Sequence, residues 1–286
     1  MTAPPTAAVL DGLALHRATG APALACLAGY RSVDRTRPGT TLAAAADAAG
    51  AAGSTDLAML VDLAAGAAIR SRIGGDRRLA TTSLAVHLLG ALPPTADLAV
   101  HVPEVAELGR LAVASTTVLA GAEVVGTGSV AFAVLGDGLP PIPWEQAGPT
   151  PHGPLREEDL TPDERDGLRH SRSAGARSWS EAVLRGSTQW SPAGLVLRPS
   201  TLMANRVGGV QGGVLVGLAV LAAEAPDGSS VLGSVQVDFV SAATVDASVT
   251  ARVEVLRESR RSRLLRVALV QSDTLVVAAT VGLRTG

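Results

Sequence analysis

The sequence predicts an α+β protein made of two similar halves, each with one long apolar helix followed by four strands of an antiparallel sheet. Two apolar stretches, Gly53–Arg70 and Asn205–Glu224, predict the helices. Strand-like segments follow each helix at similar spacing: first Leu79–Leu89, Leu98–Val105, Arg110–Ala120 and Glu123–Leu135, then Val231–Val240, Ala247–Leu256, Arg263–Gln271 and Thr274–Arg284. The matching order and spacing indicate an internal duplication.

The duplication divides the 286 residues into two domains. We expect an N-terminal repeat at 1–136, a linker rich in Pro and Gly at 137–176, and a C-terminal repeat at 177–286. The linker is expected to contain the start of a short helix at Thr161–Glu164, and another short helix is expected near Ala176–Leu184. The first 52 residues are expected to hold a poorly packed lead-in up to Ala23 with a helix at Ala8–His16, then a strand at Leu24–Val33 and a helix at Leu42–Ala52.

Composition excludes several classes of protein. Hydrophobic residues make up 47% of the chain but aromatic residues only 2%, so the cores must consist of Ala, Val and Leu. A net charge of −2 argues against nucleic acid as a partner. The single cysteine, Cys26, allows no internal disulfide and no metal–thiolate cluster, and we expect neither a metal nor a bound cofactor. The longest apolar run, Val214–Ala223, is too short to span a bilayer. With no signal peptide recognised, we expect a cytoplasmic protein.

A glycine-rich turn precedes the second helix. Gly208, Gly209, Gly212 and Gly213 can adopt backbone angles or close approaches that a Cβ prevents. A helix that begins near Gln211 leaves its first N–H groups unpaired at the positive end of the helix dipole. Such groups can bind a carbonyl oxygen that becomes negatively charged. The turn is therefore a candidate site, and simple punctuation before a helix is the alternative interpretation.

One acidic residue interrupts the first helix. Asp62 is the single polar side chain between Leu57 and Ile69, and an unpartnered carboxylate is costly to bury. It either lies on a solvent-facing edge, or faces a cleft and carries acid–base or nucleophilic chemistry with a raised pKa. Ser54 or Thr55 is expected as the N-cap of this helix.

The turn resembles the N-x-x-G-x-x-[H/Q]-G-G motif of the hotdog-fold acyl-CoA thioesterases, most closely the phenylacetate-pathway type. Here the motif consists of Asn205, Gly208, Gln211, Gly212 and Gly213. The resemblance implies a double hotdog, in which an antiparallel sheet wraps the central helix of each repeat.

The two repeats depart from the family pattern in complementary ways. The family usually has His-Gly-Gly and a catalytic Asp nine residues after the His. In the second repeat Gln211 replaces the His and Val220 replaces the acid, whereas the first repeat keeps Asp62 nine residues after Gly53. Nine residues span about 13 Å of helix, so one helix cannot present both groups to one thioester. Hotdog dimers place two such helices antiparallel. We therefore expect one composite site, with Gly212 facing Asp62, and an inactive mirror site at Gly53 and Val220.

The resemblance implies hydrolysis of an acyl-CoA thioester, as in lipid metabolism, with CoA present only as part of the substrate. The Gly212 N–H is expected to polarise the carbonyl, with Gln211 or Asn205 holding the turn. Asp62 then acts as a general base on water or as a nucleophile, and Thr81 orients the water or the carboxylate.

Other residues are expected to bind the substrate. Asn205 and Gly213 belong to the turn, while Arg260, Arg261 and Arg263 at one hairpin are candidates for the CoA phosphates. A solvated basic turn is the alternative interpretation of these arginines. The protein is also a candidate homo-oligomer.

Two other functions remain open. A catalytically silent double hotdog could bind acyl-CoA or a partner protein, and this interpretation is favoured if Asp62 is exposed and remote from Gly212. An enoyl-CoA hydratase is the weaker alternative, because the helix and the turn contain no histidine.

Overall fold

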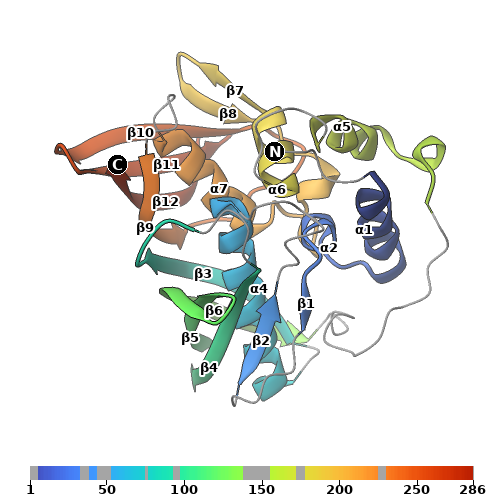
Figure 1. Cartoon of the computed structure of the whole chain (residues 1–286), viewed down its shortest axis with the longest axis horizontal. Helices are drawn as coiled ribbons and strands as arrows, with labels where there is room; N and C mark the ends of the chain where they lie inside the picture. Colours follow the sequence, from blue (N-terminus) through green and yellow to red (C-terminus); the bar gives the residue numbers. More distant parts are fainter. Residues whose placement is uncertain are drawn as a thin grey trace.

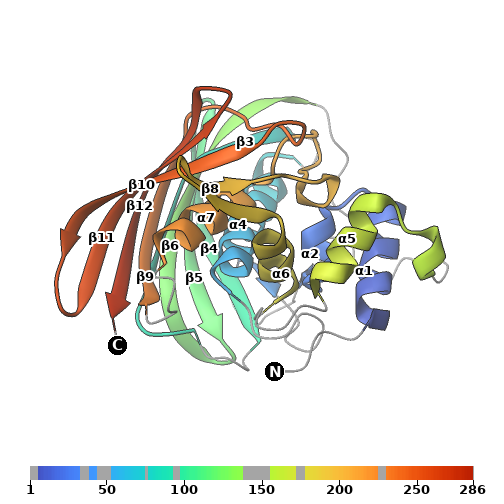
Figure 2. The ribbon, with the colours of Figure 1, turned by 90° about the horizontal axis from the view of Figure 1, so that it is seen from above.

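The computed structural model describes residues 6–32, 39–43, 53–74, 77–92, 97–137, 155–171, 178–224 and 230–285. Within these residues a twelve-stranded antiparallel sheet packs on two long helices, and a group of shorter helices lies on the other side of them (Figures 1 and 2). In the part of the chain that is described, no helix combines the length and the apolar character needed to cross a membrane.

The long helices are α4 (Ser54–Ile73) and α7 (Gly212–Ala223). The shorter ones are α1 (Thr6–Thr19), α2 (Ala23–Leu27), α5 (Pro162–Ser171) and α6 (Trp179–Gly186), with 3-10 turns at Glu157–Asp159 and Thr201–Met203. The strands are β1 (Arg31–Ser32), β2 (Thr40–Ala43), β3 (Arg77–Leu88), β4 (Leu98–Leu108), β5 (Leu111–Ala120), β6 (Glu123–Asp137), β7 (Thr188–Ser191), β8 (Gly194–Leu197), β9 (Ser230–Phe239), β10 (Val249–Glu258), β11 (Ser262–Gln271) and β12 (Thr274–Thr285).

The strand order of the sheet is symmetric about its centre. It runs β1-β2-β4-β5-β6-β3-β9-β12-β11-β10-β8-β7, so β3 and β9 meet in the middle, where Leu84 pairs with Val237. Both halves have the same sequence of one helix and four strands. The eight predicted strands are all confirmed, with ends that differ by three residues or fewer.

The first half begins differently from the prediction. The segment predicted as a strand at Leu24–Val33 forms α2, followed by the two-residue strand β1. All five side chains of α2 are buried, and a short apolar run of this kind carries no periodicity that separates a buried helix from a buried strand. Leu42 lies in β2 rather than in the predicted helix at Leu42–Ala52, of which 44–52 lies outside the described residues.

Helix α1 from the N-terminal lead-in contacts helix α5 from the linker. The predicted helix at Ala8–His16 is confirmed by α1, but Val9 and Leu13 are fully buried, so this segment is well packed. The helix predicted to start at Thr161–Glu164 is confirmed by α5, and Arg17 of α1 donates to Glu164 of α5 over 3.0 Å. Figure 2 shows these helices on the side of α4 and α7 that faces away from the sheet.

Two glycines allow the long helices to touch. A Cβ on Gly213 would lie 2.6 Å from the backbone nitrogen of Met59, and a Cβ on Gly217 would lie 2.2 Å from Oγ1 of Thr55. Position 213 therefore faces 59 and position 217 faces 55, so α4 and α7 run antiparallel. Small residues four apart permit this approach because the helix backbones can come close where no side chain intervenes. The N-terminus of α7 consequently lies beside the middle of α4.

We predict that Gly213→Ala lowers the free energy of unfolding by about 1–3 kcal/mol, because its methyl group would collide with the backbone of α4. Chemical denaturation measures this. Gly136→Ala is the matched control, since nothing lies within 4 Å of the added methyl group in β6. Equal stability of the two variants would contradict the close helix contact.

Candidate active site

Asp62 lies at the contact between the two long helices. Its side chain is buried, with 8% of its surface exposed, so it does not lie on a solvent-facing edge. Thr81 Oγ1 donates a hydrogen bond of 2.7 Å to Oδ1, and Gln211 Nε2 donates one of 3.3 Å to Oδ2. The carboxylate is therefore held by one group from β3 and one from the turn before α7.

Gln211 connects the carboxylate to the start of α7. It is the N-cap of this helix, and its Oε1 accepts a hydrogen bond of 2.8 Å from the Gly213 N–H. The other end of the same amide donates to Asp62. One neutral side chain thus fixes the turn and orients the acid.

The Gly212 amide remains available. Within the described part of the chain, its N–H donates to no acceptor, while the next amide is taken by Gln211. A Cβ on Gly212 would lie 3.5 Å from Oδ2 of Asp62 and 3.3 Å from the ring of Phe239. A free N–H at the positive end of a helix therefore lies beside a carboxylate.

A β-bulge positions Thr81. The pairing of β3 with β6 shifts register between Thr81 and Ser83, and Thr81 lies opposite Phe132. A bulge redirects a side chain locally and is common beside active sites. The neighbouring Thr82 instead donates to the Ala131 carbonyl over 3.1 Å, so the two hydroxyls have different roles.

Burial raises the pKa of Asp62 to about 6, although the hydrogen bond from Thr81, the positive charge of Arg70 and the hydrogen bond from Gln211 all act in the opposite direction. At neutral pH the carboxylate is therefore mostly ionised but remains a much better proton acceptor than an ordinary Asp. The sequence analysis did not identify Arg70, Phe132 beside Gly66 or Phe239 beside Gly212. Phe132 and Phe239 are the only phenylalanines in the chain, and this rarity could have drawn attention to them.

Two other predicted residues shape the turn. Asn205 Oδ1 accepts hydrogen bonds from the N–H groups of Val207 (3.0 Å) and Gly209 (3.1 Å), so its side chain closes the loop. Gly208 has a φ of 83°, which favours glycine. Gly213 packs against Met59 and its N–H is occupied. Both residues thus have a structural role in the turn, and their expected contacts with the substrate stay a prediction.

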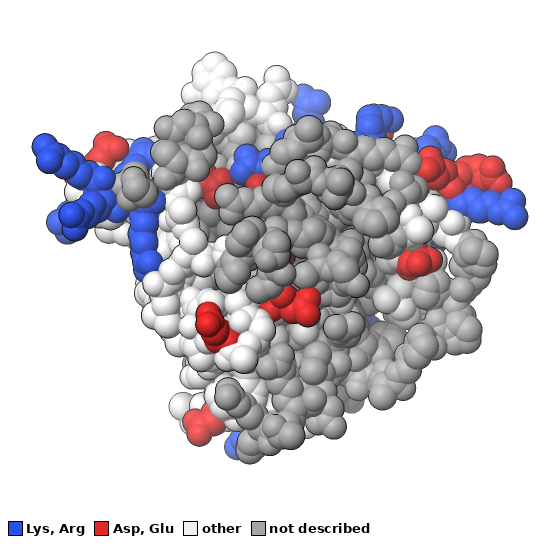
Figure 3. Space-filling model, in the orientation of Figure 1, with Lys and Arg blue, Asp and Glu red and all other residues white. Residues whose placement is uncertain are grey.

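The three arginines predicted to bind the CoA phosphates lie at the turn between β10 and β11. Arg260 and Arg261 are exposed in the β10–β11 turn, and Arg263 forms an ion pair of 3.2 Å with Glu258. Figure 3 shows basic side chains gathered at the tip of this hairpin. The hydrogen bonds of Asp62 come from Thr81 and Gln211, and the atoms nearest to a Cβ on Gly212 belong to Phe239 and Asp62.

The N-terminus of α4 is capped differently from that of α7. Its N-cap is Gly53 rather than Ser54 or Thr55, and Asp56 Oδ2 accepts from the Gly53 N–H over 2.9 Å and from the Ser178 hydroxyl. Burial raises the pKa of Asp56, which is 2% exposed. At this helix terminus the Gly53 N–H thus donates to an acidic side chain of the same helix, whereas at the start of α7 the cap is the neutral Gln211. Val220, on the opposing helix, is fully buried.

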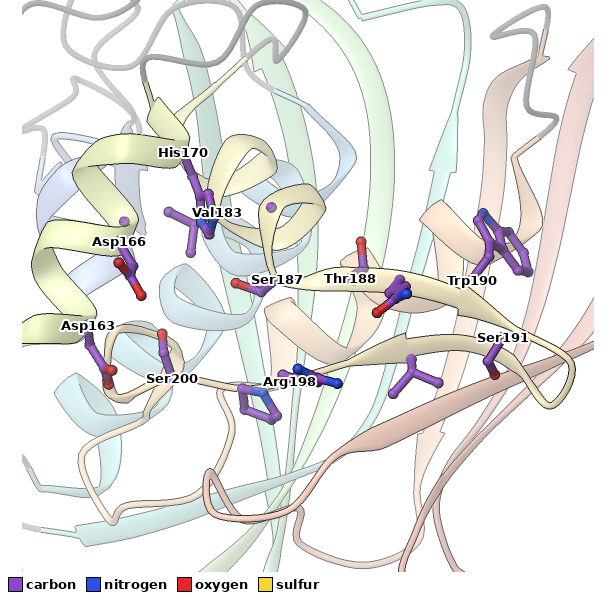
Figure 4. A pocket seen from close by; sticks show the side chains of 15 residues that line it. Asp163, Asp166, His170, Val183, Ser187, Thr188, Trp190, Ser191, Arg198 and Ser200 are labelled. Atoms are coloured by element: carbon purple, nitrogen blue, oxygen red, sulfur yellow. The ribbon is translucent and has the colours of Figure 1, made fainter.

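A cavity of about 560 Å³ lies away from Asp62. Its walls come from α5, α6, β7, β8 and the segment after β8, and it contains none of the predicted site residues. Figure 4 shows Asp163 and Asp166 at one end of this cavity and Trp190 at the other.

The described histidines and Cys26 take no part in the contacts of Asp62. Of the histidines that the structure describes, none contacts Asp62: His16 and His101 bond to Ala21 and Thr41, His87 is exposed on β3, and His170 lines the separate cavity. The pKa of buried Cys26 is raised to about 12, so its thiol is not a nucleophile. The described residues contain no cluster of three or more potential metal ligands.

One part of the chain matches a known domain family. Residues 202–284 match the family model described as acyl-CoA thioesterase N-terminal domain. A search of curated proteins found no match.

Three solved structures share the fold. An acyl-ACP thioesterase from Bacteroides thetaiotaomicron matches with a TM-score of 0.52 and 12% identity, over 82% of this chain and 90% of that one. The tesB protein of Mycobacterium avium subs paratuberculosis matches with a TM-score of 0.51 and 14% identity, over 88% and 95%. Acyl-CoA thioesterase II TesB2 from Mycobacterium marinum matches with a TM-score of 0.50 and 10% identity, over 86% and 91%. The chain therefore has the fold of these thioesterases, and its residues 202–284 match a domain family of acyl-CoA thioesterases.

Proposed function

We propose that this protein hydrolyses acyl-CoA thioesters at one composite site formed by its two halves, which we interpret as two hotdog repeats. The observation that carries the proposal is the free Gly212 N–H beside the buried carboxylate of Asp62. Each group comes from a different half, as the complementary departures from the family motif lead one to expect. The likeness to the phenylacetate-pathway type rests on the glycine turn alone.

In the proposed reaction the thioester carbonyl oxygen accepts a hydrogen bond from Gly212. Negative charge that develops on this oxygen is stabilised by the N-terminus of α7. The carbonyl carbon then lies near Asp62, because a Cβ on Gly212 would already be 3.5 Å from Oδ2. The ring of Phe239 lies beside the same place, 3.3 Å from a Cβ on Gly212.

Asp62 can activate the attack in two ways. As a general base it removes a proton from water, the water oxygen bonds to the carbonyl carbon, the carbon–sulfur bond breaks, and the departing thiolate takes the proton. As a nucleophile it bonds to the carbonyl carbon, expels the thiolate and forms an anhydride that water then hydrolyses. In both routes Thr81 and Gln211 orient the carboxylate through their hydrogen bonds.

The remaining substrate contacts and the assembly state belong to the proposal as well. Arg260, Arg261 and Arg263 supply cationic groups suited to CoA phosphates. Homo-oligomerisation is retained as part of the proposal. An exposed Asp62 remote from Gly212 would favour the silent alternative, whereas Asp62 is buried and lies beside Gly212. A hydratase would need a histidine beside Asp62, and in the part of the chain that is described the hydrogen-bond partners of Asp62 are Thr81 and Gln211.

We predict that Asp62→Asn lowers kcat/KM for thiol release by about 10²- to 10⁴-fold, because the amide can neither accept a proton nor attack carbon. The assay uses acyl-CoAs from short to long and aromatic. Asp238→Asn, an exposed acid on β9, is the control and should keep full activity. Activity that survives in Asp62→Asn would remove this residue from the mechanism, and a wild-type protein inactive on every thioester would favour the silent alternative.

We predict that kcat/KM rises with pH through a midpoint near 6, since the ionised form of Asp62 is required and its pKa is raised to about 6. Thr81→Val removes a hydrogen bond that favours the ionised form, so it should move the midpoint upward. Thr81→Ser keeps the hydroxyl and should stay near the wild-type midpoint. Identical midpoints for the valine and serine variants would contradict this role of Thr81.

We predict that Asp62→Asn stabilises the protein at pH 7 by about 1–3 kcal/mol. Because the pKa of Asp62 in the folded state is raised from 3.8 to about 6, the folded state binds more protons between these values. The free energy of unfolding must therefore fall as the pH rises from 3.8 to about 6. Asparagine at position 62 does not ionise, so Asp62→Asn avoids this loss. Urea unfolding at pH 4 and pH 7 measures the effect. A gain at pH 4 as large as that at pH 7 would refute the linkage.

A further inference from the structure

Helix α4 has no side chain at one buried position after Asp62, which is Gly66. Gly66 lies one turn after Asp62 in the middle of a long helix, where glycine costs about 1 kcal/mol relative to alanine. The missing side chain leaves a space beside the helix that two neighbours fill. A Cβ on Gly66 would lie 3.5 and 3.9 Å from the two terminal nitrogens of Arg70 and 3.7 Å from the ring of Phe132.

This contact shows how the side chain of Arg70 is directed. Arg70 follows Asp62 by eight residues, which is about 12 Å along the helix. Side chains on a helix lean toward its N-terminus, and the Arg70 guanidinium lies over Gly66, about halfway along that distance. Its positive charge is thus brought to within about one helical turn of Asp62.

The ring of Phe132 limits where the guanidinium can go. Phe132 is 4% exposed and lies opposite Thr81 across β3 and β6. The ring approaches the gap at Gly66 from the sheet side, while the guanidinium occupies the gap along the helix. The strand pair that presents Thr81 to Asp62 therefore also places Phe132 beside the gap that the guanidinium occupies.

We propose that Arg70 is a positioning residue for Asp62, whose guanidinium, folded back across the gap at Gly66, stabilises the ionised carboxylate at the active site. The consequence for catalysis rests on the proposed thioesterase function, but the electrostatic effect does not. The hydrogen-bond partners of Asp62 from other elements, Thr81 and Gln211, are both uncharged. Arg70 is the charged side chain that acts on Asp62 among the described residues, and it favours the carboxylate form.

The effect on Asp62 can be measured without substrate. Carbon NMR of protein labelled at the aspartate carboxyl groups follows the titration of Asp62, whose signal is assigned by its loss in Asp62→Asn. We expect Arg70→Gln to raise the titration midpoint by ~0.5 pH unit or more, because a full positive charge within about one turn is removed. Arg70→Lys keeps the charge and should restore most of the shift. Arg72→Gln, an exposed arginine two residues further along α4, is the control and should leave the midpoint unchanged.

A second variant moves the charge without removing it. The side chain of Gly66→Met would fill the gap and displace the guanidinium, so the midpoint should rise as in Arg70→Gln. Gly66→Ala adds only a methyl group at an ordinary contact distance of 3.5 Å and should behave as wild type. This pair keeps the proposal testable even if Arg70→Gln fails to fold.

Kinetics then separates this inference from the function itself. If the protein is a thioesterase, Arg70→Gln should lower kcat/KM at pH 6 but approach the wild-type value at pH 8, where Asp62 is ionised in both. A purely structural role would lower activity equally at both values. An unchanged NMR midpoint in Arg70→Gln and Gly66→Met would overturn the proposal even in an active enzyme, whereas a shifted midpoint in an inactive protein would uphold it and reject the function.

Discussion

The close contact of α4 and α7 is the constraint on which the rest of the structure depends. Because Gly213 and Gly217 have no side chain, the two helix backbones come close together. Met59 and Thr55 of α4 occupy the space that side chains at positions 213 and 217 would need. This contact fixes the register of the two helices. Only in this register does the N-terminus of α7 meet the middle of α4, where Asp62 stands. A wider separation would remove the hydrogen bond between Gln211 and Asp62 and leave the acid buried with one partner fewer.

The asymmetry of the two halves has a physical basis at each end of this contact. At the N-terminus of α7 a neutral glutamine caps the helix and leaves the first amide free. At the N-terminus of α4 the carboxylate of Asp56 binds the Gly53 amide, and Ser178 of α6 donates to it. The side chain at the start of α7 is therefore neutral, whereas the one that binds the Gly53 amide at the start of α4 is acidic. The similar topology of the two halves therefore supports one candidate site.

The sequence predicted the parts of the protein in which local pattern and packing agree. The eight strands and the glycine turn at Asn205–Gly213 lie where they were expected, and in β11 buried and exposed side chains alternate along most of the strand. From the nine-residue spacing we predicted that Gly212 and Asp62, which lie in different halves of the chain, face each other in one site. The beginning of the chain was harder, since α2 is buried on all sides and its Ala- and Leu-rich run has no period to read.

Other features depend on tertiary contacts that no local pattern encodes. Whether the Gly213 amide is free depends on where the Gln211 side chain turns, and that is decided by Asp62 on another helix. The approach of Arg70 depends on the gap at Gly66 and on Phe132 from β6. The arginines of the β10–β11 turn form a cluster in the sequence, and the sheet places them at the end of a hairpin.

The composite site can be tested most directly by a crystal structure of the Asp62→Asn protein with a bound acyl-CoA, since the substitution should trap the intact thioester. The account predicts that the thioester carbonyl oxygen lies within hydrogen-bond distance of the Gly212 N–H, with the side chain at position 62 beside the carbonyl carbon. An acyl-CoA whose thioester lies elsewhere, for example in the cavity between α5 and Trp190, would contradict it.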